Sequence, residues 1–243
     1  MLKFRKVGTG NNKIIMSERI LIVLTNHDSY LSGKKTGLWL GELVHVYDAL
    51  AKAGHDVDLT SPRGGKVPLD PLSTSRLFLD KLTKSYLHDD QFMGLLDKTF
   101  ASNQINPNIY TAIYYAGGHG AMWDFPDDSH LLNIAGVIYQ NGGVVAAMCH
   151  GCAGLLNIKA GDKFLIYGKR VTGYSWNEEV LVGRKNRVPF NLESELRKRG
   201  ARYSKSLIPF VSHVISDGRL ITGQNPQSAK ELAKQILFAI NKT

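Results

Sequence analysis

The sequence predicts an α/β fold, a doubly wound sandwich in which helices cover both faces of a mainly parallel sheet. Two observations support this class. Short apolar runs alternate with amphipathic segments from Arg19 to the end of the chain. Several of these runs are apolar throughout, which is typical of parallel strands buried on both faces. No repeat or low-complexity linker interrupts the pattern, so we expect one domain over residues 19–243.

The amino-terminal part begins with a strand at Arg19–Leu24, followed by a helix over residues 36–53 with apolar residues at helical spacing. A second strand is predicted at residues 56–61. Residues 61–71 are rich in Pro and Gly, so we expect an irregular surface loop there. A helical region is predicted over residues 89–100.

The carboxy-terminal part continues the alternation of strands and helices. Its expected elements, in order, are a strand at 110–118 that ends in glycines, a helix at 127–140, a buried strand at 143–148 that turns into a helix, a strand pair within 164–174, a helix at 190–199, a hairpin at 211–223 with an Asp217-Gly218 turn, and a helix at 228–240.

Composition excludes some function classes. The chain has 43% hydrophobic residues, and no stretch approaches the roughly 18 uncharged apolar residues of a membrane span. Thirty basic and 21 acidic residues give a formal charge of +9, but the basic residues are scattered, so we expect no nucleic-acid function. Residues 1–18 have basic character and no secretory h-region, and they are expected to form a flexible extension. The two cysteines, Cys149 and Cys152, suit a reducing compartment, and we expect the cytoplasm.

Chemistry-bearing residues gather at predicted strand ends. Asn26, the Gly117–Gly120 segment and Cys149 each follow a strand. In a parallel α/β sheet, sites lie beyond the carboxyl ends of the strands, so these residues are expected at one edge.

Cys149 is the candidate nucleophile because a strand followed at once by a helix forms a tight turn, as in a nucleophile elbow. Gly151 would relieve crowding at this turn, and the helix start would favour the thiolate. A packed, inert thiol is the alternative. His150 favours a catalytic role for Cys149, because the side chains of adjacent residues reach one site only where the backbone bends sharply.

Two further segments supply candidate partners. Gly117 and Gly118 leave backbone N–H groups unshielded at a strand end, which suits an oxyanion hole. His119 is a candidate substrate contact, although a buried histidine with a structural hydrogen bond is the alternative. Glu42 lies beside the apolar stripe of its predicted helix. If it points into a cleft, its pKa is raised and it can move protons.

These segments together resemble the ThiJ/PfpI superfamily, which has a class I glutamine amidotransferase-like fold. The resemblance is carried by AGGHGAMWDFPDD, GGVVAAMCHG, VTGYSWNEE, VPFNLESELRKRGARY and DGRLITGQNPQSAKELA. Within the superfamily, the sequence is similar to the branch of heat-shock chaperones and glutathione-independent glyoxalases, also called glyoxalase III. The similarity runs from about Arg19 to the carboxyl terminus.

The resemblance implies a flavodoxin-like sandwich and a homodimer. It implies that Cys149 is the nucleophile, that His150 is its neighbour in a triad, that Glu42 hydrogen-bonds the thiol, and that Gly118 and His119 help form the oxyanion pocket. The implied reaction converts methylglyoxal and similar 2-oxoaldehydes to D-lactate or the corresponding 2-hydroxy acid. The thiolate forms a hemithioacetal, a proton moves from C1 to C2, and a thioester is hydrolysed. No cofactor, metal or glutathione is implied.

Two departures from the family pattern leave alternatives open. Cys152 stands where the family usually has proline, so Cys149 and Cys152 form a CxxC that could act as a thiol switch or a redox guard. Tyr174-Ser175-Trp176 stands where some members have an Asp, which leaves Glu42 as the expected third member of the triad. A stress chaperone would need an exposed apolar patch. Protein deglycation would use the same thiol chemistry, and zinc would need two further ligands.

Overall fold

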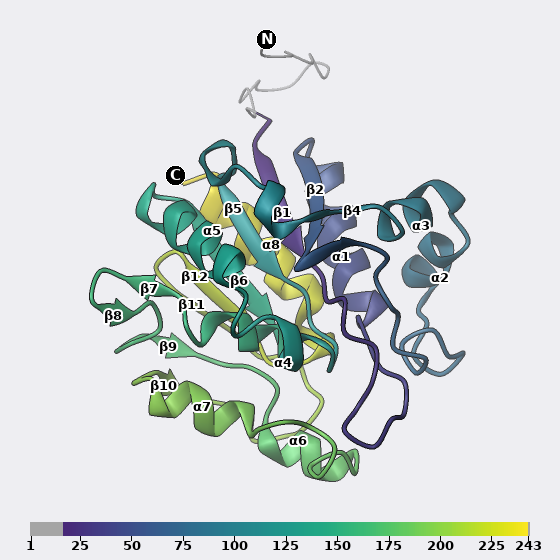
Figure 1. Ribbon diagram of the computed structural model, residues 1–243. Coiled ribbons are helices and arrows are strands. Elements are labelled where there is room, and N and C mark those ends of the chain that lie inside the picture. Colours follow the sequence, from purple (N-terminus) through teal and green to yellow (C-terminus); the bar gives the residue numbers. More distant parts are fainter. Residues whose placement is uncertain (1–16, 243) are drawn as a thin grey trace.

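The computed structural model describes residues 17–242, so residues 1–16 of the predicted extension lie outside the described part. An eight-stranded sheet of order β11-β12-β6-β5-β1-β2-β4-β3 forms the centre (Figure 1). The strands are β1 (Arg19–Val23), β2 (Asp56–Ser61), β3 (Arg63–Gly65), β4 (Thr99–Ala101), β5 (Ala112–Tyr115), β6 (Val144–Met148), β11 (Val214–Asp217) and β12 (Leu220–Gly223).

The neighbouring strands from β12 to β4 pair in parallel, and only the edge pairs β11–β12 and β3–β4 are antiparallel. Strands β1, β5 and β6 at the centre are apolar apart from Arg19 and almost entirely buried, as expected for parallel strands covered on both faces. The predicted doubly wound, mainly parallel α/β sandwich is therefore confirmed.

Helices cover both faces of the sheet. Helix α5 packs against β5 and β6 on one face, while α1 and α8 pack against each other on the opposite face (Figure 1). The helices are α1 (Leu40–Lys52), α2 (Lys81–Leu87), α3 (Asp90–Leu96), α4 (Ala121–Asp124), α5 (Ser129–Gln140), α6 (Trp176–Leu181), α7 (Leu192–Lys198) and α8 (Ala229–Ile240). Among the described residues, no helix has both the length and the apolar composition that a membrane crossing requires.

Three local predictions were wrong. Residues 61–71 are not wholly irregular, because they contain β3, which pairs with β4 and forms one edge of the sheet. The helical region predicted at 89–100 ends at Leu96, and its last residues form β4. Residues 164–174 do not form a strand pair with each other. Instead, β8 (Lys163–Phe164) pairs with β7 (Lys159–Ala160), and β9 (Arg170–Val171) pairs with β10 (Arg202–Tyr203).

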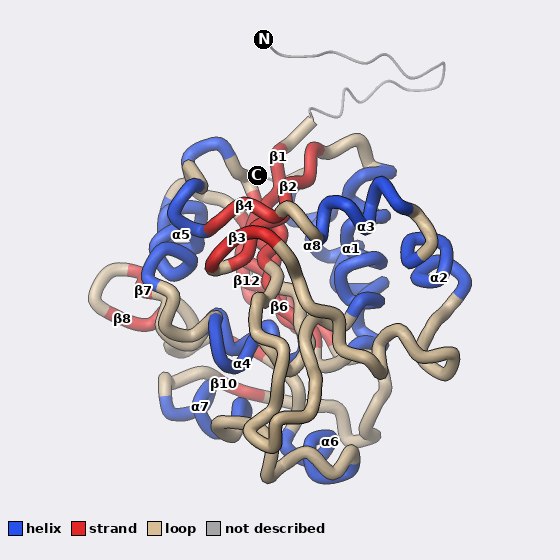
Figure 2. The backbone as a smooth tube through the Cα atoms, turned by 45° about the vertical axis from the view of Figure 1, so that its right-hand side comes forward, coloured by secondary structure: helices blue, strands red, loops and turns tan. Residues whose placement is uncertain are grey.

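The chain order places a switch point between β1 and β5, because the chain moves from β1 toward β2 in one direction and from β5 toward β6 in the other. Ligands of open α/β sheets bind outside the carboxyl ends of the strands at such a point. Long loops gather at this end of the sheet, between α4 and α6 (Figure 2). The candidate site lies here.

Candidate active site

Cys149 occupies a sharp turn directly after β6. Its backbone φ is +56°, in the left-handed region that non-glycine residues rarely adopt. The chain then continues as a 3₁₀ segment, η3 (Cys149–Leu155), rather than the expected α-helix. A Cβ on Gly151 would lie 2.4 Å from the Tyr115 carbonyl oxygen, so only glycine fits as η3 packs against β5. Strained backbone of this kind is typical of a nucleophile elbow.

The sharp turn brings the side chains of Cys149 and His150 together. Cys149 Sγ lies 3.3 Å from His150 Nδ1, although the residues are adjacent in sequence. On its other side, His150 Nε2 lies 2.7 Å from Glu179 Oε2. Thiol, imidazole and carboxylate therefore form a continuous chain, the arrangement in which an oriented imidazole can accept a thiol proton.

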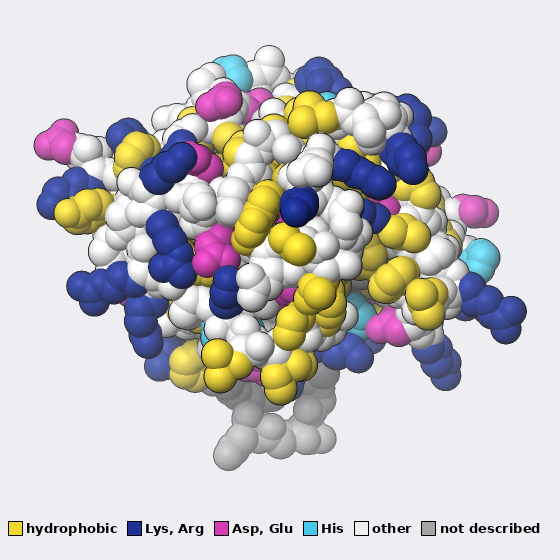
Figure 3. Space-filling model, turned by 90° about the horizontal axis from the view of Figure 1, so that it is seen from below, with side chains coloured by type: hydrophobic (Ala, Val, Ile, Leu, Met, Phe, Trp, Pro, Cys, Tyr) yellow, Lys and Arg dark blue, Asp and Glu magenta, His cyan; other side chains and the backbone are white. Residues whose placement is uncertain are grey.

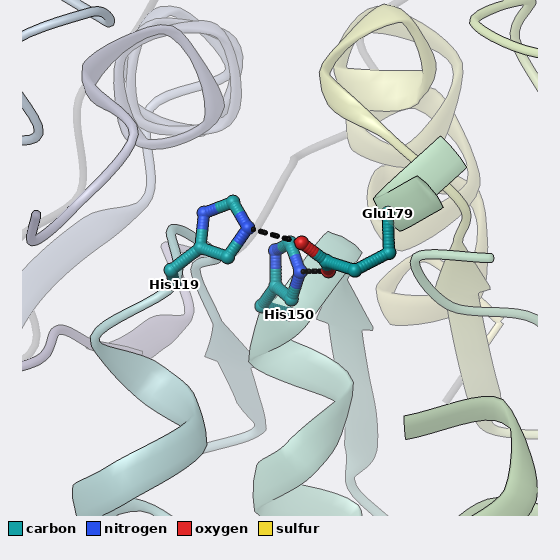
Figure 4. Close-up of side chains that lie close together, drawn as sticks. All are labelled: His119, His150 and Glu179. Atoms are coloured by element: carbon teal, nitrogen blue, oxygen red, sulfur yellow. Dashed lines mark hydrogen bonds and ion pairs between the residues drawn. The ribbon is translucent and has the colours of Figure 1, made fainter. Parts of the chain in front are cut away.

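Glu179 connects two histidines. It extends from α6, and both imidazoles point toward its carboxylate from neighbouring strand ends (Figure 4). Its second oxygen, Oε1, lies 3.0 Å from His119 Nε2. Burial opposes ionisation here, but the interactions with His150 and His119 hold the pKa of Glu179 well below its usual range. Glu179 is therefore a carboxylate at neutral pH.

His119 is buried and uses both ring nitrogens. Its Nδ1 lies 3.2 Å from Arg184 Nη1, and its ring contacts that of His150 with centroids 3.8 Å apart and planes tilted by 34°. Burial first, and the neighbouring His150 second, lower the pKa of His119 to about 3. The imidazole is thus neutral, and its hydrogen bonds go to protein groups in the present arrangement.

Glu42 reaches the same cluster of side chains from the first turn of α1 and is fully buried. Its Oε2 accepts a hydrogen bond from the Gly117 backbone N–H at 2.9 Å, and its Oε1 has no hydrogen-bond partner among the described residues. Burial raises the pKa of Glu42 to about 8, while contacts with Cys149 and Gly117 oppose that shift. Glu42 is therefore largely protonated at neutral pH and can donate a proton in the pocket.

The two candidate oxyanion glycines differ in their surroundings. The Gly117 N–H is occupied by Glu42, whereas within the described part of the chain the Gly118 N–H meets no acceptor. Gly118 has a φ of +109°, and a Cβ there would lie 2.2 Å from the Gly37 carbonyl oxygen. Only glycine fits this position, and its unpaired amide remains the candidate oxyanion donor.

The pKa of the Cys149 thiol differs from the expectation drawn from the sequence. The helix start was expected to favour the Cys149 thiolate, but burial and the neighbouring Glu42 raise the pKa of Cys149, and only the His150 backbone N–H lowers it. The short 3₁₀ segment provides a weaker dipole than a full helix. The resting residue is therefore a thiol, and it needs a base to become a nucleophile.

Cys152 is held apart from this chain of groups. Both cysteines are free, and the Cys152 thiol donates a hydrogen bond to the Thr172 carbonyl oxygen at 3.4 Å. Burial raises its pKa well above the usual value, with a smaller contribution from Glu42. Cys152 is thus a buried, protonated thiol with a partner of its own.

One group in the described part of the chain has ligand types that suit a transition metal. The ligand atoms of His119, His150 and Glu179 all lie within 4.8 Å of one another. Two imidazoles and a carboxylate are typical zinc ligands. Here both imidazoles direct Nε2 at the carboxylate, so a metal would have to replace both of these hydrogen bonds.

Glu179 was missed in the sequence, as was helix α6. A signal was present, because Ser175 and Glu178 form a capping box in which each side chain bonds the other's backbone N–H. The motif S-x-x-E marks the start of a helix and predicts that Glu179 lies in its first turn. It does not predict which way Glu179 points.

Comparison with known proteins supports the resemblance seen in the sequence. The profile of the DJ-1/PfpI family matches residues 36–239. The chain belongs to the DJ-1/PfpI family. It is 34% identical to glutathione-independent glyoxalase HSP31 of Saccharomyces cerevisiae over 92% of this chain and 98% of that protein.

Solved structures of family members are also similar. Rapid Encystment Protein 24 KDa of Francisella tularensis shares 40% identity, with a TM-score of 0.88 over 92% of this chain and 99% of that chain. Glyoxalase III of Candida albicans shares 30% identity, with a TM-score of 0.85 over 91% of this chain and 97% of that chain. The predicted glyoxalase III-like branch of the family is confirmed by these relatives.

Proposed function

We propose that this chain is a glutathione-independent glyoxalase with Cys149 as its nucleophile, converting methylglyoxal and similar 2-oxoaldehydes to D-lactate or the corresponding 2-hydroxy acid. The observation that carries the proposal is the hydrogen-bonded chain Cys149–His150–Glu179 facing a protonated Glu42. Relatives with glyoxalase names at about one-third identity support it.

The first step is addition of the thiol to the aldehyde. His150 Nδ1 takes the Cys149 thiol proton while Sγ bonds to C1 of the substrate. The electrons of the C1 carbonyl move to oxygen, and the Gly118 N–H stabilises the resulting alkoxide. The imidazolium then protonates this oxygen, which gives a neutral hemithioacetal and restores neutral His150.

The second step moves hydrogen from C1 to C2. Neutral His150 removes the C1 proton, and Glu42 protonates the C2 carbonyl oxygen, which forms an enediol. The C1 hydroxyl then returns its proton to Glu42 while the imidazolium delivers a proton to C2. The product is a thioester of the 2-hydroxy acid. A pKa near 8 suits Glu42 to this exchange, because general acids and bases act best when their pKa is near the working pH.

Hydrolysis completes the cycle. His150 removes a proton from water, the hydroxide attacks the thioester carbonyl, and Cys149 leaves as a thiolate that regains its proton. The sum is addition of one water to methylglyoxal, with no net oxidation or reduction. Every proton transfer uses a group that this chain supplies. Glu179 stays ionised and stabilises the imidazolium each time it forms.

The test is methylglyoxal consumption without glutathione, with D-lactate measured directly by a D-lactate-specific assay. We expect wild type to form D-lactate and Cys149→Ala to form none. If wild type forms no D-lactate under reducing conditions, the proposal is overturned. Formation of L-lactate or of a racemate would overturn its stereochemical part.

A chaperone is the second candidate, because exposed apolar side chains gather near the site. Figure 3 shows several such groups on the face that carries α6. Segment 207–211 touches α6 through the hydrogen bond from the Phe210 N–H to Glu178 Oε1. The exposed side chains of these two segments are Val180, Leu181, Val182, Leu207, Ile208, Phe210 and Val211. Suppression of citrate synthase aggregation by Cys149→Ala, lost in Leu181→Asp/Leu207→Asp, would establish this activity.

Assembly and location complete the proposal. We propose a homodimer, as the resemblance implies, and a cytoplasmic location, where both buried thiols stay reduced. Light scattering coupled to size exclusion tests the first, since the 26.9 kDa chain should elute at twice its mass.

A further inference from the structure

The contact between Arg184 and His119 fixes the position of a proton. A guanidinium only donates hydrogen bonds, so Arg184 Nη1, 3.2 Å from His119 Nδ1, requires a lone pair on that nitrogen. An imidazole with a lone pair on Nδ1 is neutral, so the one ring proton of His119 must be on Nε2. The hydrogen bond on one imidazole nitrogen thus decides the state of the other.

The same reasoning extends to His150. The His119 Nε2–H donates to Glu179 Oε1 at 3.0 Å, which turns the other carboxylate oxygen, Oε2, toward His150. That oxygen accepts from His150 Nε2 at 2.7 Å, so the tautomer of His150 that fits this contact carries its proton on Nε2. The bare Nδ1 then faces Cys149 Sγ and can take its proton.

Arg184 is itself held in place. It follows α6 in the loop that begins at Val182, and its side chain is mostly buried. Its Nη1 lies 3.9 Å from the buried carboxylate of Asp70, and its guanidinium carbon lies 5.3 Å from the centre of the Tyr30 ring. Asp70 also accepts a hydrogen bond from the Thr36 hydroxyl at 2.8 Å, so the loops around α1 and α6 together orient Arg184.

We infer that Arg184 is a positioning residue that acts through His119 and Glu179 to set the tautomer of His150, and thereby leaves the lone pair of Nδ1 on the Cys149 side. This role in catalysis rests on the proposed glyoxalase function, but the proton positions do not. Without Arg184, His119 can carry its proton on Nδ1. The bare Nε2 would then face Glu179 Oε1 with two lone pairs opposed, and the carboxylate would turn away from His150.

Nitrogen-15 NMR of histidine-labelled protein tests the proton positions directly, because the shifts of the two ring nitrogens distinguish the tautomers. The chain has eight histidines, and His119→Phe and His150→Phe assign the two signals. We expect Nε2–H for both residues in wild type at pH 7. An Nδ1–H tautomer for either residue in wild type overturns the inference without any variant of Arg184.

Iodoacetamide alkylation of Cys149 at pH 7 tests the consequence without turnover. We expect Arg184→Met to slow alkylation by about 10-fold to 100-fold. Arg184→Lys should recover part of the rate, since an ammonium also donates to His119. The matched control is Lys185→Met, which removes the same charge from the same loop at an exposed side chain. Its rate should stay within about twofold of wild type.

A double-mutant cycle separates this pathway from a general loss of positive charge. His119→Phe keeps a ring against His150 but removes both hydrogen bonds, so Arg184→Met should add nothing in that background. If the losses of alkylation rate caused by the two substitutions multiply in the double variant, the inference is overturned. An unchanged His150 tautomer in Arg184→Met also overturns it. Absence of D-lactate in wild type would instead reject the proposed function, with the NMR and alkylation results still decisive for Arg184.

Discussion

Glu179 Oε2 lies 2.7 Å from His150 Nε2, although the two residues are 29 positions apart in the sequence. The contact joins a six-residue helix to the turn after β6. The adjacent Glu178 points elsewhere and accepts hydrogen bonds from Ser175, Gln224 and Asn225. Neighbouring carboxylates therefore have separate tasks: one orients the imidazole, and the other anchors the helix that carries it.

Replacing Glu179 by Gln should remove activity with little loss of structure. The shape is kept, but the amide NH₂ must face one of the two histidine donors, and the negative charge that stabilises the imidazolium is lost. We expect kcat to fall by about 10³-fold, with KM changing much less. Steady-state kinetics checks this. A kcat within fivefold of wild type would show that Glu179 does not orient His150.

Glu178→Gln should show the opposite pattern. Glu178 is fully buried and accepts five hydrogen bonds, so an amide in its place leaves at least one donor unsatisfied. We expect a loss of about 1–3 kcal/mol in the free energy of unfolding. Urea denaturation measures it. At temperatures where the variant is folded, kcat should fall far less than in Glu179→Gln, and an equal fall would reject the division of tasks.

The stability of wild type should fall with rising pH because of Glu42. Its pKa is about 8 in the folded protein and near 4.5 when unfolded. Between these values the unfolded chain loses this proton while the folded chain keeps it, so the group's stabilisation is complete below pH 4.5 and is lost toward pH 8. Relative to Glu42→Gln, wild type should lose about 1 kcal/mol per pH unit in this window. Curves of the free energy of unfolding against pH that run parallel for wild type and Glu42→Gln would contradict this.

Gly118→Ala should damage the fold more than a glycine with similar backbone geometry elsewhere. Gly118 has a φ of +109° and its added Cβ would meet the Gly37 carbonyl at 2.2 Å, whereas Gly142 has a φ of +89° and open space around it. We expect Gly142→Ala to cost about 1 kcal/mol and Gly118→Ala at least twice that. Thermal unfolding of both variants is the measurement, and equal costs would show that the close approach does not matter.

Cys152→Ala should retain most activity. The Cys152 thiol bonds Thr172 and takes no part in the chain from Glu179 to Cys149. Under reducing conditions we expect kcat within about threefold of wild type and a small loss of stability from the vacated volume. Both proteins are treated with hydrogen peroxide and then reduced with a thiol reagent. A lower recovery of activity in Cys152→Ala than in wild type would support the redox guard. Equal recovery would make Cys152 a neutral replacement for proline.

Much of the fold and part of the site could be predicted from the sequence. The alternation of apolar runs and amphipathic segments determines the layers, and strand ends of a parallel sheet share one edge. Both Cys149 and the Gly117–His119 segment follow such strands, so the sequence predicts that they lie together. The sharp turn at Cys149 followed from its position between a buried strand and a glycine.

The remainder depends on long-range packing. Glu42 lies in a helix whose pattern does not say whether its side chain faces water or the pocket, and only the resemblance assigned it a role. Glu179 lies in a helix too short for a periodic signal, so its direction is determined by contacts with His119 and His150. The short strand pairs β7–β8 and β9–β10 were missed because each of their strands has only two residues.

The depth of Cys149 limits the size of the molecules that can react. Only 4% of this residue is exposed, and His150 beside it is still less accessible. Because so little of this residue meets solvent, we expect a small free aldehyde to react with Cys149 faster than an adduct carried on a side chain of a folded protein. The ratio of these two rates measures how strongly the burial of the sulfur selects against bulky substrates.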